Sequence, residues 1–438
     1  MNRKEFIKNT SVATAGITIL NFPVFGKNAP SNKVLVAVMG VNSRGAYLAE
    51  CFSQLSNVEV AYICDVEEKA IANGLKPFAS ATRKPIVIKD IRQLVNKKDF
   101  DALIIATPDH WHAPAAILGI THGKHVYVEK PCGHNPHEGE LLIQAMKKYP
   151  KQFIQMGNQR RSMPKLIEAA KQVKEGIIGN TYFGKSWYAN NRKSIGYGKK
   201  VPVPPTLDFD LWQGPAPRRD YKDNLIHYNW HWFWHWGTSE TCNNATHELD
   251  MCRWFLGVDY PTKVTSAGGR YAYKDDWETP DTQVATFEFG GNKSITWEGR
   301  SCNKMGVEGA SRGFIIYGEK GTLVNKSNDD YTIYDADNKL VKEVKASVSN
   351  DGTNTVSATG NLDFFHFNNF VDSIRGDATI NSPMNEAHKS ILLCHLANIA
   401  QRTGRTLHCD PKNGYILNDP GAMKLWKREY EKGWEPKL

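Results

Sequence analysis

The stretch that decides the fold of this chain is Val34-Leu35-Val36-Ala37-Val38-Met39-Gly40-Val41-Asn42-Ser43-Arg44-Gly45. It opens with an apolar run of strand length, and residues 46–55 after the glycine turn have helical character. A second apolar run, Val58–Cys64, ends at Asp65, twenty residues after Gly45. A strand, a glycine turn, a helix and a second strand ending in an acidic residue form the layout of a dinucleotide site. An ordinary βαβ turn is the alternative.

The residue types in this turn suit a pyrophosphate. Gly40 permits the tight turn, and Gly45 lets helix and strand approach each other, although Asn42 replaces the middle glycine of the usual fingerprint. Free N–H groups at the helix start face the phosphates. Asp65 would accept hydrogen bonds from the ribose and repel a 2′-phosphate, which favours NAD over NADP. The predicted cofactor contacts here are Gly40, Asn42, Ser43, Arg44, Gly45 and Asp65.

Two further apolar runs end in polar strings. Residues 102–106 lead into Thr107-Pro108-Asp109-His110-Trp111-His112, and residues 126–128 lead into Glu129-Lys130-Pro131. Strands that alternate with helices at this pitch predict a parallel sheet, whose ligands bind at the carboxyl ends of the strands. The polar strings should therefore lie at one edge of an N-terminal α/β Rossmann domain.

Four strings together resemble the Gfo/Idh/MocA oxidoreductase family, which includes glucose–fructose oxidoreductase and inositol dehydrogenases. They are Gly40–Gly45, Ala106-Thr107-Pro108 with His112, Glu129-Lys130-Pro131, and His247-x-x-Asp250. The resemblance covers residues 33–410 and implies a second α+β domain with an open, mostly antiparallel sheet. The expected division is an export signal over 1–30, an NAD(P)-binding domain over 31–155, a substrate and oligomerisation domain over 156–415, and a tail over 416–438.

The resemblance also implies a catalytic lysine. Lys130 would hydrogen-bond the reacting hydroxyl and move its proton, with a pKa drawn toward neutrality by the nicotinamide cation. Pro131 would shape the turn that aims this lysine, and Thr107, Pro108, His112 and Glu129 would complete the cofactor contacts. A surface salt bridge is the alternative role for Lys130.

Residues 243–254 predict a helix that carries Asn243, His247, Asp250 and Trp254 on one face. By resemblance, His247 faces the substrate and assists proton transfer or holds a sugar hydroxyl. The alternative is a structural histidine bonded to Asp250. Inositol dehydrogenases have an aspartate where this chain has Asn243, so Lys130 should do more of the acid–base work while Asn243 binds hydroxyls.

Other predicted substrate contacts come from polar and aromatic segments. Arg160 belongs to the string 157–161 that enters the second domain, where it could reach the cofactor or substrate or join the domains. Residues 185–192 predict a strand ending in polar groups. In residues 228–236, tryptophans at alternate positions would share one face of a strand, forming either a sugar platform or core packing. From these segments we expect substrate contacts from Trp187, Asn190, Arg192, Trp234 and His235.

Composition excludes several classes of protein. The 438 residues carry a formal charge of +9 without any basic block, so we expect no nucleic-acid partner. No run of 18 apolar residues exists, so we expect no membrane span. The eight cysteines form no C-x-x-C pair. A site built from Cys242, His247 and Cys252 is conceivable, but we interpret most cysteines as buried small apolar residues and predict no metal.

The N-terminus has the layout of an export signal. Arg3-Lys4-Glu5-Phe6-Ile7-Lys8 precedes an apolar stretch and the breaker Asn21-Phe22-Pro23. The basic string resembles a twin-arginine signal with lysine in the second arginine position. We predict an exported, periplasmic protein; the alternative is a frayed helix on a cytoplasmic one.

Three functions remain open from the sequence. The first is a nicotinamide-dependent oxidoreductase acting on a hydroxyl of a sugar, glycoside or cyclitol, with its cofactor tightly bound. The second is an NAD-retaining glycoside hydrolase or lyase that works by transient oxidation and elimination. The third is a non-catalytic sugar-binding protein, which would leave Lys130 idle. By resemblance, homo-oligomers would form through the second sheet.

Overall fold

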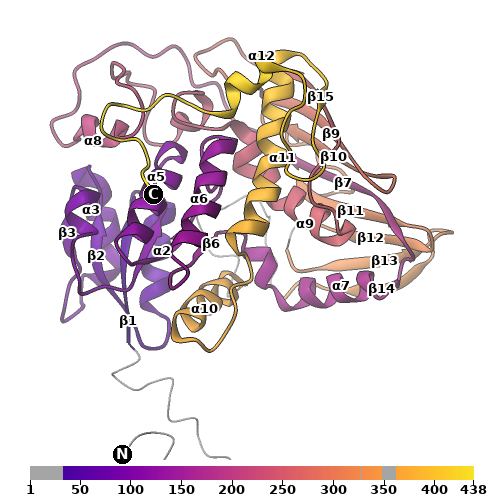
Figure 1. Ribbon diagram of the computed structural model, residues 1–438, viewed down its shortest axis with the longest axis horizontal. Helices are drawn as coiled ribbons and strands as arrows, with labels where there is room; N and C mark the ends of the chain where they lie inside the picture. The colour runs from indigo at the N-terminus through magenta and orange to yellow at the C-terminus, as the bar shows by residue number, and fades with distance from the viewer. Residues whose placement is uncertain (1–32, 327, 348–361) are drawn as a thin grey trace, which may run out of the picture.

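The computed structural model describes residues 33–326, 328–347 and 362–438. Two α/β bodies lie side by side, with the N-terminal one in indigo and the second one around a large sheet in orange (Figure 1). The predicted export signal falls outside the described residues.

The first body holds, among the described residues, six parallel strands in the order β3-β2-β1-β4-β5-β6. This is the predicted Rossmann sheet. Its strands are β1 (Val34–Met39), β2 (Val58–Cys64), β3 (Ile86–Ile88), β4 (Ala102–Ile105), β5 (His125–Val128) and β6 (Ile154–Met156). Its helices are α2 (Arg44–Ser53), α3 (Glu68–Leu75), α4 (Ile91–Leu94), α5 (Asp109–Thr121) and α6 (Pro136–Lys148), with a 3₁₀ turn over Lys76–Phe78.

The apolar runs formed these strands because helices cover both faces of the sheet. Val36, Ala37 and Val38 of β1 are fully buried, as a central parallel strand requires. The second strand has the predicted bounds. Helix α2 begins at Arg44, two residues earlier than expected, so the turn is short and the first helical N–H groups lie directly beyond β1.

The second body holds a sheet of nine strands within the described residues, in the order β14-β13-β12-β11-β7-β10-β9-β8-β15. Only the β7–β10 pairing is parallel among these neighbours, which confirms the mostly antiparallel sheet. The strands are β7 (Thr181–Ala189), β8 (Lys263–Gly269), β9 (Thr282–Phe289), β10 (Lys293–Arg300), β11 (Arg312–Gly318), β12 (Gly321–Asn325), β13 (Tyr331–Asp335), β14 (Leu340–Val344) and β15 (Leu407–His408).

The remaining helical elements cover or border this sheet. They are η3 (Gln159–Ser162), α7 (Pro164–Lys174), α8 (Phe209–Gln213), η4 (Asn229–Trp232), the π-helical η5 (Thr241–Ala245), α9 (Thr246–Leu256), α10 (Leu362–Arg375), α11 (Met384–Thr403), α12 (Pro420–Met423) and η6 (Lys424–Trp426). The predicted helix over 243–254 is therefore a π segment that continues into α9.

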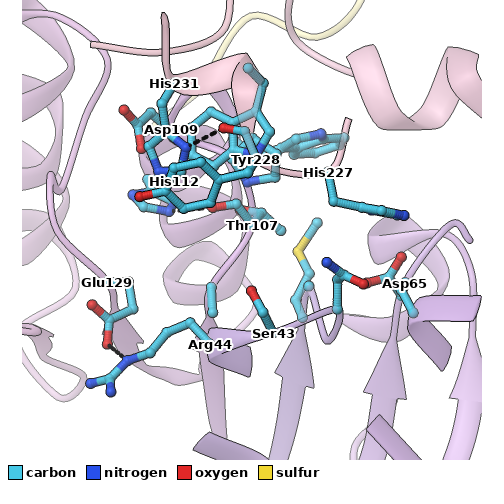
Figure 2. Close-up of a pocket in the computed structure, with 18 of the residues that line it drawn as sticks. Ser43, Arg44, Asp65, Thr107, Asp109, His112, Glu129, His227, Tyr228 and His231 are labelled. Atoms are coloured by element: carbon cyan, nitrogen blue, oxygen red, sulfur yellow. Dashed lines mark hydrogen bonds and ion pairs between the residues drawn. The ribbon is translucent and has the colours of Figure 1, made fainter. Parts of the chain in front are cut away.

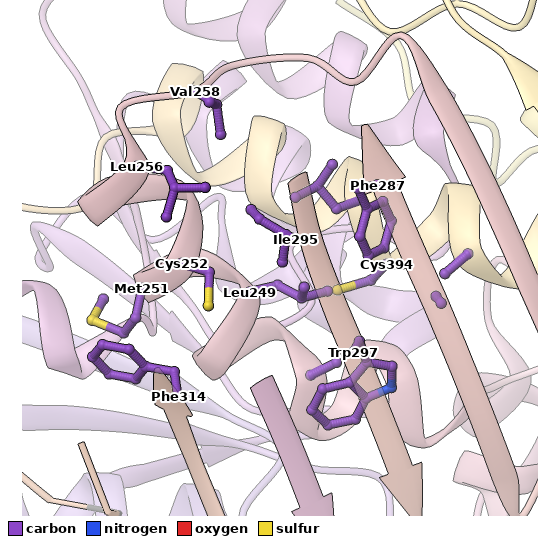
Figure 3. Packing of buried hydrophobic residues seen from close by; sticks show 14 of the residues in the cluster. Leu249, Met251, Cys252, Leu256, Val258, Phe287, Ile295, Trp297, Phe314 and Cys394 are labelled. Carbon is purple, nitrogen blue, oxygen red and sulfur yellow. The ribbon is translucent and has the colours of Figure 1, made fainter. Parts of the chain in front are cut away.

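The main core of the second body lies between the sheet and helices α9 and α11. Figure 3 shows Leu249 and Cys252 of α9 packing toward Ile295 and Trp297 of β10. On the opposite face of the sheet, Val284 is 47% exposed. Oligomerisation through this sheet stays a prediction.

The expectation of a strand over residues 228–236 was wrong. The chain makes a 3₁₀ turn at Asn229–Trp232, so its tryptophans do not share one face. Instead, each ring has its own partner: Trp232 stacks on Trp277 with centroids 4.0 Å apart, and Trp236 meets Trp212 edge-on at 5.7 Å. Both rings are buried, so the period-two pattern reflects core packing in an irregular segment.

Candidate active site

A pocket lies at the carboxyl ends of β1, β2, β4 and β5, between the two bodies (Figure 2). Most of the predicted site residues line it, although they come from distant parts of the sequence. These residues are Gly40, Asn42, Ser43, Arg44, Asp65, Thr107, Pro108, His112, Glu129, Lys130, Arg160, Asn243 and His247. The predicted site is thus brought together at the expected edge of the sheet.

The glycine turn leaves room for a dinucleotide. Gly40 has φ +81°, and a Cβ there would lie 2.7 Å from the backbone nitrogen of Thr107. A Cβ on Gly45 would lie 1.7 Å from the Gly40 carbonyl oxygen, so Gly45 packs the helix on the strand and does not line the pocket. The N-terminus of α2 faces the space beside Gly40, and the free backbone N–H groups of a helix N-terminus suit a pyrophosphate.

Two carboxylates stand where the ribose of a dinucleotide would lie. Asp65 accepts hydrogen bonds from the backbone N–H groups of Val41, Val66 and Glu67 at 2.7–3.0 Å. Burial raises the pKa of Asp65, although these three bonds oppose the shift. Glu67 also lines the pocket. Negative charge here suits ribose hydroxyls and disfavours a 2′-phosphate, so the residues fit NAD.

Lys130 stands at the centre of the site. Its Nζ donates to Oδ1 of Asn243 at 2.8 Å, which links the first body to the π segment η5. Burial lowers the pKa of Lys130, against the opposing charges of Glu129 and Asp109. Lys130 thus lines the pocket and bonds Asn243, so the surface salt bridge considered as its alternative role is wrong.

Glu129 forms an ion pair with Arg44 within the first body. It accepts from Arg44 Nε at 2.9 Å (Figure 2). Arg44 also pairs with Asp363 of α10 at 3.1 Å. Burial would raise the pKa of Glu129, but the charges of Arg44 and Lys130 outweigh it and hold the pKa below its usual range. Arg44 thus meets carboxylates at the floor of the pocket.

His112 joins the two polar strings. Its Nδ1 lies 2.6 Å from the carbonyl oxygen of Pro131, and its Nε2 lies 2.8 Å from that of Thr107. The Lys130–Pro131 peptide is cis. Pro131 therefore lies behind the pocket wall and contributes its carbonyl to the His112 ring, while Thr107 and Pro108 line the pocket itself.

Asn243 is fixed from behind by a buried carboxylate. Its Nδ2 donates to Glu240 Oε1 at 3.2 Å, and Arg192 donates to Glu240 Oε2 at 2.6 Å. The amide orientation that presents Oδ1 to Lys130 is set by this chain of bonds. Arg192, predicted as a substrate contact, instead lies outside the pocket and supports Asn243 through Glu240.

His247 has a ring open to the pocket. Within the described part of the chain it makes no hydrogen bond, and Asp250 bonds Arg161 at 2.7 and 2.8 Å instead. The structural alternative for His247 is therefore wrong. Burial, with the charges of Arg312 and Lys130, holds the pKa of His247 well below its usual value.

Four other predicted substrate residues lie outside this pocket, because their side chains are already engaged. Trp187 is 1% exposed and donates to the Ala310 carbonyl at 2.9 Å. Asn190 donates to the Tyr188 hydroxyl at 2.6 Å. Arg402 sits 4.6 Å from the ring of Trp234, and His235 Nε2 lies 2.7 Å from the Pro217 carbonyl.

The pocket also contains residues that the sequence prediction did not include among the site residues. Asp109, Tyr228 and His231 gather near His112 (Figure 2). Asp109 accepts from the Thr238 hydroxyl, and burial raises its pKa. His231 stacks on Trp230 at 3.6 Å, and its Nδ1 lies 2.6 Å from the Tyr228 carbonyl. The signal for Asp109 was its place in the 107–112 string. The signal for His231 was its place in residues 228–236, where the sugar-platform interpretation lets it bond hydroxyls, and Tyr228 gave none beyond its polarity.

Among the residues that the structure describes, no group of three His, Cys, Asp or Glu side chains could hold a metal ion. In the same part of the chain, no helix is long and apolar enough to cross a membrane.

Comparisons with known proteins agree with this fold. The model of the Gfo/Idh/MocA oxidoreductase family, with an NAD-binding Rossmann fold, matches residues 34–157, and the model of its C-terminal α/β domain matches residues 173–436. An α-N-acetylgalactosaminidase from Shewanella oneidensis is 29% identical over 211 residues, 43% of this chain and 46% of that protein. A glycosyl hydrolase family 109 protein from Shewanella pealeana is 28% identical over 213 residues, with the same coverage. The aligned part thus spans less than half of these relatives.

Two solved structures share the fold at low identity. A levoglucosan dehydrogenase in complex with NADH and levoglucosan has a TM-score of 0.66 and 17% identity, covering 86% of this chain and 99% of that one. The WlbA dehydrogenase from Bordetella pertussis, in complex with NADH and UDP-GlcNAcA, has a TM-score of 0.63 and 19% identity, with the same coverage. Because the two family models span most of its length, this chain is an NAD-binding enzyme of the Gfo/Idh/MocA oxidoreductase family.

Proposed function

We propose that the enzyme oxidises or reduces a hydroxyl-bearing carbon of a sugar, glycoside or cyclitol. The observation that carries this proposal is the buried Lys130 Nζ, bonded to Asn243 and lining the same pocket as His247. A lysine with a lowered pKa can take a hydroxyl proton near neutral pH. When bound, NAD supplies the hydride acceptor or donor for this chemistry.

Lys130, Asn243 and His247 would have different roles in this reaction. Neutral Lys130 takes the proton of the reacting hydroxyl in the oxidative direction and returns it in the other. Asn243 holds the Nζ in place and presents its amide to neighbouring hydroxyls. The ring of His247, which makes no hydrogen bond within the described part of the chain, can donate to or accept from a second hydroxyl of the sugar. The remaining pocket residues of the first body would hold the dinucleotide.

A second candidate is an NAD-retaining glycoside hydrolase or lyase that works by transient oxidation and elimination. Such a reaction needs a further group to take a carbon-bound proton and one to protonate the leaving oxygen. Tyr228 and His231 supply titratable groups in the same pocket as Lys130. The similarity to a protein named α-N-acetylgalactosaminidase supports this candidate, and the Glu129-Lys130-Pro131 string supports the first.

One experiment separates the two candidates. The protein is purified, its bound nicotinamide is measured by absorbance, and a panel of sugars and nitrophenyl glycosides is added. Stoichiometric reduction of the bound cofactor that then stalls supports the dehydrogenase. Repeated aglycone release without net reduction supports the hydrolase or lyase. A sugar that binds with neither response would instead support the third hypothesis, a non-catalytic sugar-binding protein.

We further propose that the protein is exported to the periplasm, on the strength of residues 3–23 alone. Outside the cytosol there is no ready NAD pool, so export requires a cofactor that stays bound between turnovers. Fusion of residues 1–35 to a reporter that is active only after export tests this. Arg3→Lys, which removes the one arginine of the basic string, should reduce export, and an inactive fusion that stays in the cytosol would contradict the proposal.

A further inference from the structure

One wall of the pocket is a long segment of the second body, residues 204–236, which we call the cover segment. Its pocket-lining residues are Leu207, Leu211, Trp212, Ile226, His227, Tyr228, Trp230 and His231. The segment crosses from the second body to the first and lies across the cofactor side of the pocket. A dinucleotide bound on β1 and β2 would therefore lie against the cover segment.

The cover segment is attached to the first body directly after Asp65. Asp208 donates its backbone N–H to the Val66 carbonyl at 3.0 Å, and Glu68 donates to the Thr206 carbonyl at 3.0 Å. At the other end of the cover segment, His227 Nε2 lies 3.2 Å from Glu67 Oε2. Figure 2 places His227 on the same side of the pocket as Asp65.

A second attachment comes from the C-terminus, residues 427–438, which we call the strap. In Figure 1 the yellow chain runs from α12 past α8 and ends beside α5. Arg428 donates from Nε to Glu138 Oε1 at 2.7 Å and from Nη2 to the His110 carbonyl at 2.6 Å. Tyr430 donates to the same Glu138 oxygen at 2.8 Å, and Glu138 is fully buried. The strap is thus anchored on α5 and α6.

The strap then binds the cover segment. Glu431 donates its backbone N–H to the Pro215 carbonyl at 3.0 Å, and its Oε2 accepts from the Arg218 N–H at 3.2 Å. One short stretch of chain therefore connects the helices of the first body to the middle of the cover segment.

Trp434 of the strap packs behind the pocket wall. Its ring meets Trp111 edge-on at 5.1 Å, and Arg92 Cζ lies 4.4 Å from its centroid. Trp111 lines the pocket and donates to the Trp212 carbonyl of the cover segment at 2.9 Å. Arg92 bonds Asp90, which lines the pocket as well. Trp434 thus contacts Trp111, which lines the pocket, and Arg92, which bonds the pocket residue Asp90. Trp434 does not line the pocket itself.

We propose that the strap holds the cover segment closed over the bound dinucleotide and sets the rate at which NAD leaves, with Trp434 as its principal positioning residue. The proposal depends on NAD binding and not on which reaction the enzyme performs. A failure of the proposed function would therefore leave it standing.

The test measures NADH release directly. The full-length protein is loaded with NADH, excess NAD⁺ is added, and the decay of nicotinamide fluorescence is followed. Trp434→Ala removes an aromatic edge contact and a cation–π contact, so release should be about tenfold faster than in the wild type. Trp434→Phe keeps a ring and should give an intermediate rate. Deletion of residues 432–438 should give the same NADH release rate as Trp434→Ala, because Arg428, Tyr430 and Glu431 and their contacts remain.

A matched control separates positioning from general stability. Tyr260 is also half-buried, lies 6.0 Å from Lys389 Nζ, and does not line the pocket. Tyr260→Ala should lower the Tm of the apo protein about as much as Trp434→Ala but leave the release rate unchanged. The proposal is overturned if Trp434→Ala folds and releases NADH at the wild-type rate, or if both variants speed release equally.

Discussion

The amide oxygen of Asn243 accepts a 2.8 Å hydrogen bond from Nζ of Lys130, and this contact joins the loop after β5 to the π segment before α9. An uncharged acceptor at this position matters for the pKa of the lysine. Burial lowers that pKa, and the amide does not restore it as a carboxylate would. In the oxidative direction the proposed base is the neutral amine, so kcat/KM for oxidation should rise with pH through a pKa below the usual 10.5 of a lysine.

Asn243→Asp should move that limb to higher pH. A carboxylate beside Nζ favours the ammonium form, so the pKa of Lys130 rises and less base is present at pH 7. We expect kcat/KM at pH 7 to fall about tenfold or more, with partial recovery at high pH. Asn303→Asp, on an exposed turn where Oδ1 accepts from the Met305 N–H, is the matched control. An unshifted pH profile in Asn243→Asp would show that Asn243 does not tune the lysine.

His247→Gln tests the second substrate contact. Its ring has no hydrogen-bond partner in the described part of the chain, so its substitution should weaken the contact with the substrate and leave the fold intact. We expect kcat/KM for the sugar to fall roughly 10²-fold while NAD affinity stays unchanged. His408→Gln, at an exposed strand end, provides the comparison. A wild-type kcat/KM in His247→Gln would show that His247 does not contact the substrate.

Asp65→Asn tests the choice of cofactor. The substitution removes the negative charge that suits ribose hydroxyls and repels a 2′-phosphate. NAD should bind about tenfold more weakly, and the preference for NAD over NADP should narrow, as measured by titration of intrinsic fluorescence. Equal weakening toward both dinucleotides would mean that Asp65 acts only through its bonds to Val41, Val66 and Glu67.

The fold was predictable because its signals are local. Apolar runs of strand length, each followed by polar residues, located Asp65 and Lys130 at one edge of a parallel sheet, since such strands end at the same edge. The residues of the cover segment could not be placed in this way. Tyr228 and His231 reach the pocket through an irregular segment whose path depends on contacts with distant residues.

The wrong expectations for residues 228–236 and for Arg192 also arise because contacts with distant residues decide where these side chains lie. Alternating tryptophans suit a strand, but they suit equally a turn in which each ring finds a separate partner, as Trp232 does on Trp277. Arg192 follows a strand as expected, yet the buried carboxylate of Glu240 lies closer to it than the pocket does. Sequence alone does not show which buried charge will attract a polar side chain.

The buried His366 predicts that acid destabilises the protein. Burial lowers its pKa to about 4, and its ring nitrogens lie 2.7 Å from the Ser162 hydroxyl and 2.9 Å from the Met156 carbonyl. Because the folded pKa lies below the unfolded value of about 6.5, the neutral ring favours folding above pH 6.5. That contribution is lost as the pH falls toward 4, by about 3 kcal/mol.

Urea unfolding of wild type and His366→Gln at several pH values checks this. His388 and His395 shift in the same direction, with pKa values of about 4 and about 3, so only the difference between the two proteins isolates His366. The free energies of unfolding should converge as the pH falls. Parallel curves would contradict the assignment.

The central claim is that neutral Lys130 is the base of a nicotinamide-dependent reaction on a sugar hydroxyl. The most direct measurement is the single-turnover rate at which bound NAD changes its absorbance after a reactive sugar is added, compared between wild type, Lys130→Ala and Lys130→Arg at matched cofactor occupancy. We predict that both variants keep NAD but lose about 10³-fold in rate, with Lys130→Arg no better than Lys130→Ala because its guanidinium does not deprotonate. Wild-type rates in either cofactor-loaded variant would contradict the account.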